Sequence, residues 1–313
     1  MWGLARKAQS AETGGVVIDG DGIAVARARE RPGGKALLQS CAYQPVASEE
    51  LRPAVLQQSI GAGGLGRGRC NAVLPLGEYQ LLLTEAPDVP PAELRAAMRW
   101  RIRELIDFHV DDAVIDVFDA PAGGAGSAQR QMYVVVARAA LVERLVSELQ
   151  DARLELHAID IPELALRNVA AQLPEDGNGL AMLYFGRDRG LIILTRQSEL
   201  YLARTLDTGY SQLAGAGPEE SERLVQSLAL EVQRSVDYYD RHFMQAPVSS
   251  LVLAPLPEPV PGLVDGLHRD LGMQVRELAL DEIVEPAAGV DGTVAGHCLL
   301  AVGAALREEE RRL

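Results

Sequence analysis

One pattern of three short strands joined by two tight turns occurs twice in this sequence, and it limits the folds that the chain can adopt. The first copy has apolar runs at 14–19, 23–29 and 36–46, and the second has them at 179–185, 191–195 and 200–206. Gly, Asp and Pro residues dominate the intervening turns, and such short turns favour antiparallel hairpins. The sequence therefore predicts two related three-stranded meanders, one in each half of the chain.

Helical and strand patterns follow each meander. The patterns predict helices over 49–60, 219–243, 262–271 and 294–310, and strands over 70–76, 250–254 and 274–280. In the long helix 219–243, apolar residues recur at i+4 spacing and leave the other faces charged, which is typical of a helix that buries one stripe. Helices and strands mixed in this way indicate an α/β architecture.

A block of different character separates the two meanders. Pro90 and Pro91 open a predicted helix whose apolar face is Leu94, Met98, Ile102, Leu105 and Ile106. Proline is tolerated in a first helical turn, because the amide it lacks has no partner there. Strands over 113–118 and 132–137, a polar loop over 120–129 and a helix over 141–152 follow, before the chain returns through a strand over 154–159 and a helix over 162–173. This block reads as an inserted subdomain.

We therefore expect three structural units. The first unit comprises residues 12–75, 154–175 and 293–313; the insertion comprises 76–153; and the second unit comprises 176–292.

Composition excludes several classes of function. The chain has 313 residues and 48% hydrophobic content, enough for a sizeable core, and its 30 basic and 44 acidic residues give a net charge of −14. Nucleic acids and anionic lipid surfaces attract positive potential, so neither is an expected partner. Residues 1–7 lack the apolar run of a signal peptide, and no apolar stretch is long enough to span a bilayer. We expect a soluble, cytoplasmic protein.

The cysteines and histidines predict neither a disulfide framework nor a metal site. Cys41, Cys70 and Cys298 are odd in number and far apart, and the five histidines lack ligand spacing. The segment 61–66 matches G-x-G-x-x-G, but it follows a predicted helix and precedes a strand. A dinucleotide fingerprint needs the opposite order, so this segment is interpreted as a loop.

The turn Asp19-Gly20-Asp21-Gly22 is the most informative motif. Its amides and carboxylates lie at the first turn of the repeated meander, where two facing hairpins can hold a phosphate and its Mg²⁺. Together with the duplication, the turn suggests an actin-like fold, in which two related halves close on a nucleotide. The second copy lacks the leading acid, because Tyr184-Phe185-Gly186 takes its place and Asp188 lies further into the turn.

Four segments resemble the PilM-type actin-like proteins of type IV pilus assembly. The resemblance is closest to the family members that serve mannose-sensitive haemagglutinin (MSHA) pili. The most specific is AMRWRIRELIDFHVDDAVIDVF at 97–118; the others are Ile159-Asp160, LEVQRSVDYY at 230–239 and AVGAALR at 301–307. The resemblance implies a duplicated, ribonuclease H-like, actin-like α/β fold with an inserted α/β subdomain. It also implies a cytoplasmic scaffold that docks on a PilN-like inner-membrane protein and meets the membrane only through that partner.

The family's nucleotide motifs carry over unevenly. The resemblance implies nucleotide contacts at Asp19, Gly20, Asp21, Gly22, Asp160, Gly186, Asp188 and Glu231. Asp21 stands where a small residue is usual and would repel phosphate without a cation. The adenosine motif reads Ala254-Pro255-Leu256-Pro257, and proline lacks the amide and the backbone freedom of the usual glycines.

We therefore expect a degenerate nucleotide site with no catalytic residue and no required cofactor. The alternative is an ATPase that binds ATP with Mg²⁺ around Asp19 and Asp160 and regulates pilus assembly by domain closure. A sugar kinase on the same fold ranks last, because we find no sugar-binding motif.

A row of arginines is the candidate partner site. Arg95, Arg99 and Arg103 recur at i+4 beside Trp100 and Leu105, and they could receive an acidic and apolar peptide in a groove between the first unit and the insertion. The alternative is an ordinary solvated helix face. Self-association is also left open.

Overall fold

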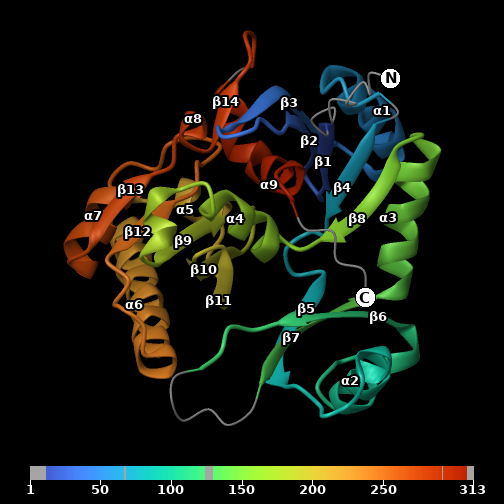
Figure 1. Cartoon of the computed structure of the whole chain (residues 1–313). Helices are drawn as coiled ribbons and strands as arrows, with labels where there is room; N and C mark the ends of the chain where they lie inside the picture. The colour runs from blue at the N-terminus through green and yellow to red at the C-terminus, as the bar shows by residue number, and fades with distance from the viewer. Residues whose placement is uncertain (1–11, 67, 124–129, 291, 309–313) are drawn as a thin grey trace, which may run out of the picture.

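Each predicted meander forms one side of a separate β-sheet (Figure 1). In the computed structural model, which describes residues 12–66, 68–123, 130–290 and 292–308, the first meander is β1 (Glu12–Ile18), β2 (Gly22–Arg29) and β3 (Ala36–Pro45). The second is β9 (Leu180–Phe185), β10 (Gly190–Arg196) and β11 (Glu199–Leu206). Both pair antiparallel throughout. The N-terminal residues 1–7 and part of the predicted loop 120–129 lie outside the described residues.

The duplication extends beyond the meanders. β4 (Arg69–Val73) pairs parallel with β1, and β8 (Glu155–Asp160) pairs parallel with β4, giving the order β3-β2-β1-β4-β8. In the second sheet, β12 (Ser250–Leu253) and β13 (Gln274–Glu277) extend β9 in the same way, giving β11-β10-β9-β12-β13. The two sheets therefore share one topology.

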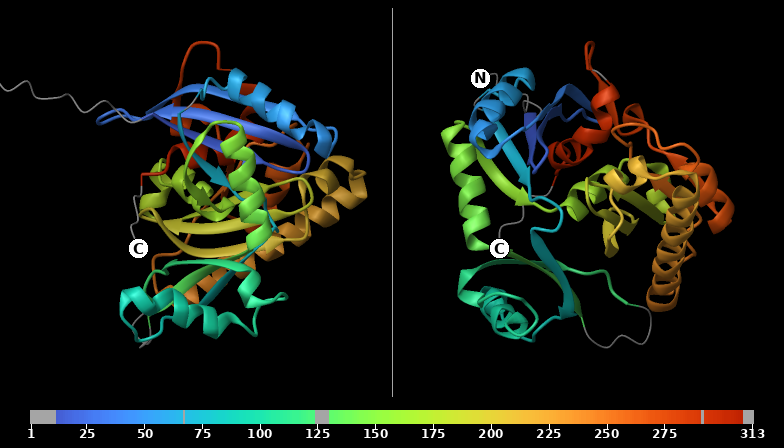
Figure 2. Two further views of the ribbon diagram at one scale, coloured as in Figure 1. Left: turned by 90° about the vertical axis from the view of Figure 1, so that its right-hand side faces the viewer. Right: turned by 180° about the vertical axis from the view of Figure 1, so that it is seen from behind.

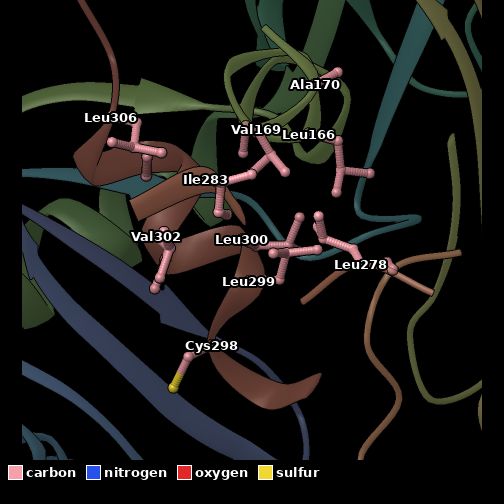
Figure 3. Packing of buried hydrophobic residues seen from close by; sticks show 14 of the residues in the cluster. Leu166, Val169, Ala170, Leu278, Ile283, Cys298, Leu299, Leu300, Val302 and Leu306 are labelled. Carbon is pink, nitrogen blue, oxygen red and sulfur yellow. The ribbon is translucent and has the colours of Figure 1, made fainter. Parts of the chain in front are cut away.

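Two helices separate the sheets. α9 (Ala295–Ala305) packs on β1 and β2, and α4 (Pro162–Ala170) packs on β10 and β11. Their facing side chains interdigitate in the largest apolar cluster (Figure 3), where Leu166 and Val169 of α4 lie close to Leu299 and Leu300 of α9. Burial on both sides makes this helix pair the centre of the molecule.

Glycine allows this helix pair to approach its neighbours closely. A Cβ atom on Gly15 of β1 would lie 1.7 Å from the carbonyl oxygen of Ala301, and one on Gly303 of α9 would lie 2.2 Å from that of Ala165. No side chain fits at such distances, so the backbones of β1, α9 and α4 are in direct contact.

Further helices cover the outer faces. α1 (Arg52–Ala62), preceded by η1 (Glu49–Leu51), and α3 (Ala139–Asp151) cover the first sheet, and α6 (Pro218–Phe243) and α7 (Leu263–Leu271) cover the second. The apolar stripe predicted for 219–243 faces this second core, where Leu228, Val232 and Val236 are buried. α5 (Tyr210–Gly215) and η4 (Pro174–Gly177) complete the second half. Among the described residues, no helix is long and apolar enough to cross a membrane.

The insertion forms a third sheet, in the order β5-β7-β6. β6 (Ala113–Asp119) and β7 (Gln131–Arg138) are the two predicted strands, preceded by the short turn η3 (Val110–Asp112). The third strand, β5 (Tyr79–Glu85), was not predicted. α2 (Leu94–Ile102), which follows η2 (Pro91–Glu93), covers one face of this sheet, and both views of Figure 2 place the insertion at one end of the molecule, away from α1 and β14.

Three segments differ from the expected organisation. α2 ends at Ile102, so Leu105 lies outside the helix and is 57% exposed. α3 was assigned to the insertion, but Leu145 and Leu149 pack in the core of the first sheet. β14 (Val284–Pro286), which follows α8 (Leu280–Ile283), was assigned to the second unit but pairs with β3 of the first sheet; η5 (Gly292–Val294) then leads into α9.

Candidate functional site

The structure brings the two predicted phosphate turns together at one cavity of about 370 Å³. Asp19, Asp21 and Gly22 line one side, and Gly186 and Arg187 line the other. Because these turns belong to the two equivalent meanders, the cavity lies between the two sheets at corresponding ends. Its walls also include residues that the sequence did not suggest, among them Tyr43, Tyr210 and His297.

The first turn uses several of its own polar groups. The amide of Asp19 donates to the carbonyl of Gly22 at 2.9 Å, and the amide of Gly20 donates to Oδ1 of Asp19 at 2.6 Å. The carbonyl of Asp21 accepts from the amide of Val46 at 2.9 Å. The Gly20 amide therefore binds a carboxylate of its own turn rather than pointing free into the cavity.

The carboxylate of Asp21 is the main electrostatic feature of the cavity. Burial raises the pKa of Asp21, the nearby charge of Asp19 raises it further, and the guanidinium of Arg187 opposes both effects. The Nη1 atom of Arg187 lies 3.9 Å from Oδ1 of Asp21. Two carboxylates thus face one cation, and a phosphate entering here would meet repulsion.

The second turn is closed by the backbone at the start of α5. The amides of Tyr210 and Ser211, at the start of α5, donate to the carbonyls of Gly186 and Arg187 at 2.8 and 2.9 Å. The first amides of a helix are the usual cradle for phosphate, and here these two are occupied. Asp188 is exposed and lies 3.9 Å from Nε of Arg187, outside the cavity lining.

The opposite wall of the cavity is formed by the proline-containing segment 254–257 and by aromatic rings. A Cβ atom on Gly296 would lie 2.3 Å from the carbonyl carbon of Leu256, so the start of α9 lies directly against Leu256 and Pro257. The rings of Tyr43 and His297 stack with centroids 3.9 Å apart, and burial lowers the pKa of His297. These groups make this wall apolar and aromatic.

Four predicted nucleotide residues do not line this cavity: Gly20 and Asp188 belong to the two turns, whereas Asp160 and Glu231 lie elsewhere. Asp160 is buried at the end of β8, where its carboxylate accepts a hydrogen bond from Arg307 at 2.8 Å. Burial raises the pKa of Asp160, and Arg307 opposes that rise. Glu231 of α6 pairs with Arg204 at 3.2 Å and with Arg234 at 2.7 Å. The structure therefore does not bring Asp160 or Glu231 to the Asp19 turn.

The lining residues fit a magnesium-bound triphosphate poorly. Arg187 is the one arginine or lysine that lines the cavity among the described residues, and it already faces Asp21. No group of three or more metal-binding side chains is found in the described part of the chain.

A second concave region of about 420 Å³ lies between the insertion and the first sheet. β6 is the outer strand of the small sheet and β8 is the outer strand of the six-stranded sheet, and both border this groove. Its apolar walls comprise Val114, Phe118, Val135, Ala137, Val142, Leu164 and Leu200. We call this region the β6–β8 groove.

Charged side chains line the floor and rim of the β6–β8 groove. Asp160, Arg167 and Arg307 lie together at the floor, and Arg95 pairs with Asp116 at 3.1 Å at the rim. Glu199 and Leu200 of β11 close one end, so the second half of the chain also contributes to this groove.

Of the four residues predicted to bind a partner, Arg95 alone lines the β6–β8 groove. Met98 and Ile102 pack α2 against the face of the small sheet that carries Val134 and Val136, whereas Val114 and Val135 belong to the groove lining. Arg99 donates to the carbonyl of Ala113 and pairs with Asp111 at 3.3 Å.

The remaining two residues form a small exposed patch at the end of α2, which we call the α2 patch. Trp100 is 76% exposed, and the guanidinium of Arg103 lies 5.8 Å from the centroid of its ring. Arg103 also lies 3.9 Å from Glu104. The i+4 spacing correctly placed Arg95 and Arg99 on one helix, whereas Arg103 follows the last helical residue. The spacing could not show which side of the insertion borders the groove.

Comparison with solved structures identifies the architecture. A structure of a PilM–PilN type IV pilus biogenesis complex superposes with a TM-score of 0.76, at 18% identity, over 95% of this chain and 98% of that chain. A Bacteroides thetaiotaomicron protein with an actin-like ATPase fold and unknown function superposes with a TM-score of 0.52, at 9% identity, over 95% of this chain and 99% of that chain. The chain has an actin-like fold.

The actin-like fold confirms the fold class expected from the duplicated meander. The cytoplasmic domain of EpsL, an inner-membrane component of the type II secretion system of Vibrio cholerae, also superposes with a TM-score of 0.52, at 12% identity, over 96% of this chain and 97% of that chain. No protein-family model matches the sequence, and a search of curated proteins finds no significant match. At these identities the comparisons establish the actin-like fold, and function must be argued from the site.

Proposed function

We propose that this chain is a cytoplasmic scaffold of a type IV pilus assembly platform that docks the cytoplasmic segment of a PilN-like inner-membrane protein. Two comparisons support the proposal. The PilM–PilN complex matches nearly the whole chain, and the EpsL cytoplasmic domain belongs to an inner-membrane component of a secretion system. The protein would then lie at the inner membrane through its partner.

The β6–β8 groove is the observation that carries this proposal. Two outer strands, from two different sheets, border a groove of about 420 Å³ that has apolar walls and a charged floor. An extended peptide can pair its backbone with such a strand while its alternate side chains enter apolar pockets. Val114 of β6 is 43% exposed at this position, which is high for a valine in a strand. A short apolar peptide with few charges fits these walls.

The resemblance of residues 97–118 narrows the proposal to the MSHA pilus system and to the role of its MshI protein. This segment forms α2, the following turns and β6, and β6 borders the groove. Co-purification of the full chain with the inner-membrane MSHA proteins would test this assignment. Recovery of a different pilus or secretion system would contradict it.

A peptide titration tests the groove directly. We expect a synthetic peptide with the N-terminal cytoplasmic segment of the PilN-like partner to bind the full chain. Val114→Glu should weaken binding by about tenfold or more, because it places a charge against an apolar ligand. Arg103→Glu, on the far side of the insertion, is the matched control and should leave the affinity unchanged. If Arg103→Glu weakened binding and Val114→Glu did not, the α2 patch would be the docking site.

The alternative function is an ATPase whose domain closure regulates pilus assembly. The observation in its favour is that the two turns of the duplicated meander face one cavity. A fluorescent ATP analogue, titrated with and without Mg²⁺, distinguishes the alternatives. Micromolar, Mg²⁺-dependent binding that is lost in Asp19→Ala would favour the ATPase. No binding at millimolar analogue would favour the scaffold with a degenerate site.

Self-association is a separate part of the proposal. Sedimentation velocity of the full chain, with and without the partner peptide, measures whether copies assemble and whether docking changes that assembly. Membrane fractionation of cells with and without the PilN-like protein tests whether the partner recruits the chain to the membrane.

A further inference from the structure

Two cysteines from opposite ends of the sequence meet beside the Asp19 cavity. Cys41 lies on β3 and Cys298 on α9, and the thiol of Cys41 lies close enough to Cys298 to raise its pKa. Cys298 is fully buried in the central cluster (Figure 3), whereas Cys41 is half-buried and packs against that cluster.

The contact has independent geometric support from the neighbouring residues. Tyr43 is on the same face of β3 as Cys41, because strand side chains alternate with a period of two. Its ring stacks on that of His297, which precedes Cys298 on α9, with centroids 3.9 Å apart. Two successive positions on one face of β3 thus contact two successive residues at the start of α9.

The third cysteine lies elsewhere. Cys70 of β4 is buried in the core between the first sheet and α1 and α3, whereas Cys298 is buried in the core that contains α9 and α4. The first sheet separates these cores, so Cys70 cannot reach the other two thiols without unfolding. The pairing of Cys41 with Cys298 is therefore specific.

We propose that Cys41 and Cys298 form an oxidisable thiol pair that closes to a reversible disulfide on exposure to peroxide. The disulfide would join β3 to α9 next to Tyr43 and His297, which line the Asp19 cavity. Oxidation would thus fix one wall of the cavity between the two halves. This inference is independent of the proposed docking function.

The chemistry proceeds in two balanced steps. The sulfur of Cys41 attacks one peroxide oxygen, the O–O bond breaks, water leaves, and Cys41 becomes a sulfenic acid. The sulfur of Cys298 then attacks the sulfenic sulfur, the S–O bond breaks, and a second water leaves with the Cys298 proton. One peroxide is reduced and two thiols are oxidised to one disulfide.

The environments of the two thiols set this order. The neighbouring thiol of Cys41 and burial both raise the pKa of Cys298, which keeps it a protonated thiol. The half-buried Cys41 is the sulfur that a small oxidant reaches first. Because Cys298 is a poor nucleophile as a thiol, the second step should be the slower one.

Alkylation of the full chain tests the proposal. The Cys70→Ser variant keeps the pair and leaves no third thiol, so it is the informative background, and Cys41→Ser and Cys298→Ser are the matched variants that break the pair. Each protein is treated with hydrogen peroxide, blocked with N-ethylmaleimide in denaturant and weighed by intact mass spectrometry. Tryptic peptides then identify any linked pair.

We expect Cys70→Ser to lose about 2 Da and both sites of alkylation on oxidation, to give a linked Cys41–Cys298 peptide, and to recover both sites with dithiothreitol. Its thermal midpoint should rise on oxidation. The wild type should retain one alkylatable thiol, at Cys70. Conversion of Cys41 to sulfinic acid in Cys70→Ser while Cys298 stays alkylatable would overturn the proposal. A linked peptide that contains Cys70 in the wild type, or a disulfide between chains, would also overturn it.

If a pair-breaking variant fails to fold, the peptide map of oxidised Cys70→Ser still decides the question. It reports the linkage without either variant.

Discussion

Arg307 donates a hydrogen bond to the buried carboxylate of Asp160 at 2.8 Å and so ties the chain after α9 to the end of β8. The side chain of Asp160 is 1% exposed and that of Arg307 is 15% exposed. The family resemblance suggested Asp160 for a magnesium-dependent site. In the structure this carboxylate instead belongs to a structural ion pair at the floor of the β6–β8 groove.

Removing the arginine of this ion pair should destabilise the fold. Arg307→Met leaves the Asp160 carboxylate buried without its ion-pair partner, and we expect the free energy of unfolding at pH 8 to fall by about 3 kcal/mol. The double variant Asp160→Asn with Arg307→Met removes the buried charge and should recover most of the loss. Urea denaturation measures both, and equal losses in the single and double variants would show that the buried charge is not the cause.

A second buried carboxyl makes stability depend on pH. Burial raises the pKa of Glu163 from its ordinary 4.5 to about 7, although the hydroxyl of Tyr79 donates to this carboxyl and lowers the pKa. The folded protein then holds a proton that the unfolded chain releases. The free energy of unfolding should therefore fall by roughly 3 kcal/mol as the pH rises from about 4.5 to about 7.

Glu163→Gln should remove this dependence. The amide stays neutral and can still accept from Tyr79, so we expect a flatter profile between pH 5 and 7 and a gain of about 2 kcal/mol at pH 8. Urea denaturation at several pH values measures the effect. Tyr79→Phe is the complementary variant: it removes a hydrogen bond that favours the ionised form and should move the decline to higher pH. A profile of wild-type shape in Glu163→Gln would assign the dependence to another group.

Two glycine substitutions should have opposite effects. The added methyl in Gly15→Ala would collide with the backbone of α9 at Ala301, and we expect a loss of about 3 kcal/mol or more. Gly61 lies in α1 with open space around its missing Cβ, so Gly61→Ala should stabilise the protein by about 0.5–1 kcal/mol. Thermal and urea denaturation compare the two, and a loss in both would point to a general effect of the added methyl.

One hydrogen bond should hold the insertion against the second half. The hydroxyl of Tyr133 on β7 donates to the backbone carbonyl of Tyr201 on β11 at 2.9 Å. Tyr133→Phe should cost about 1 kcal/mol and raise deuterium uptake in β5 and β7. Tyr201→Phe keeps the accepting carbonyl and should leave that uptake unchanged. Equal uptake in both variants and the wild type would show that other contacts hold the insertion.

The elements set by local chemistry were predicted from the sequence. The turn at Gly20, Asp21 and Gly22 and the turn at 186–190 define hairpins within a few residues, and the observed β1, β2, β9 and β10 match the predicted runs closely. The stripe of α6 follows in the same way from its i+4 spacing. Duplication of these local signals was enough to indicate the actin-like fold.

The missed elements depend on distant partners. Tyr79–Glu85 forms β5 by pairing with residues 131–137, and its side chains are half-buried or exposed, so it has no continuous buried face to mark a strand. β14 is only three residues long and is defined by its pairing with β3. In both cases the partner strand that defines the element lies elsewhere in the chain, so residues 79–85 and 284–286 alone do not indicate a strand.

The same limit applied to the candidate site. The turns at Asp19 and Gly186 were identified because each lies within its own hairpin. Tyr43 and His297 line the same cavity from opposite ends of the chain, and no spacing rule joins them. The i+4 spacing placed Arg95 and Arg99 on α2 correctly, but Arg103 follows the end of that helix. Which side of the insertion borders the groove depends on how α2 packs on the small sheet.

The position of α9 in the sequence has a consequence for synthesis of the chain. The first sheet begins at residue 12, yet the helix that covers its inner face is 295–305 and its outer strand β14 is 284–286. The second sheet is complete once residue 277 has been made. On the ribosome, the second half can therefore assemble its own sheet while the inner face of the first sheet is still uncovered. The N-terminal half is therefore the part most in need of a chaperone.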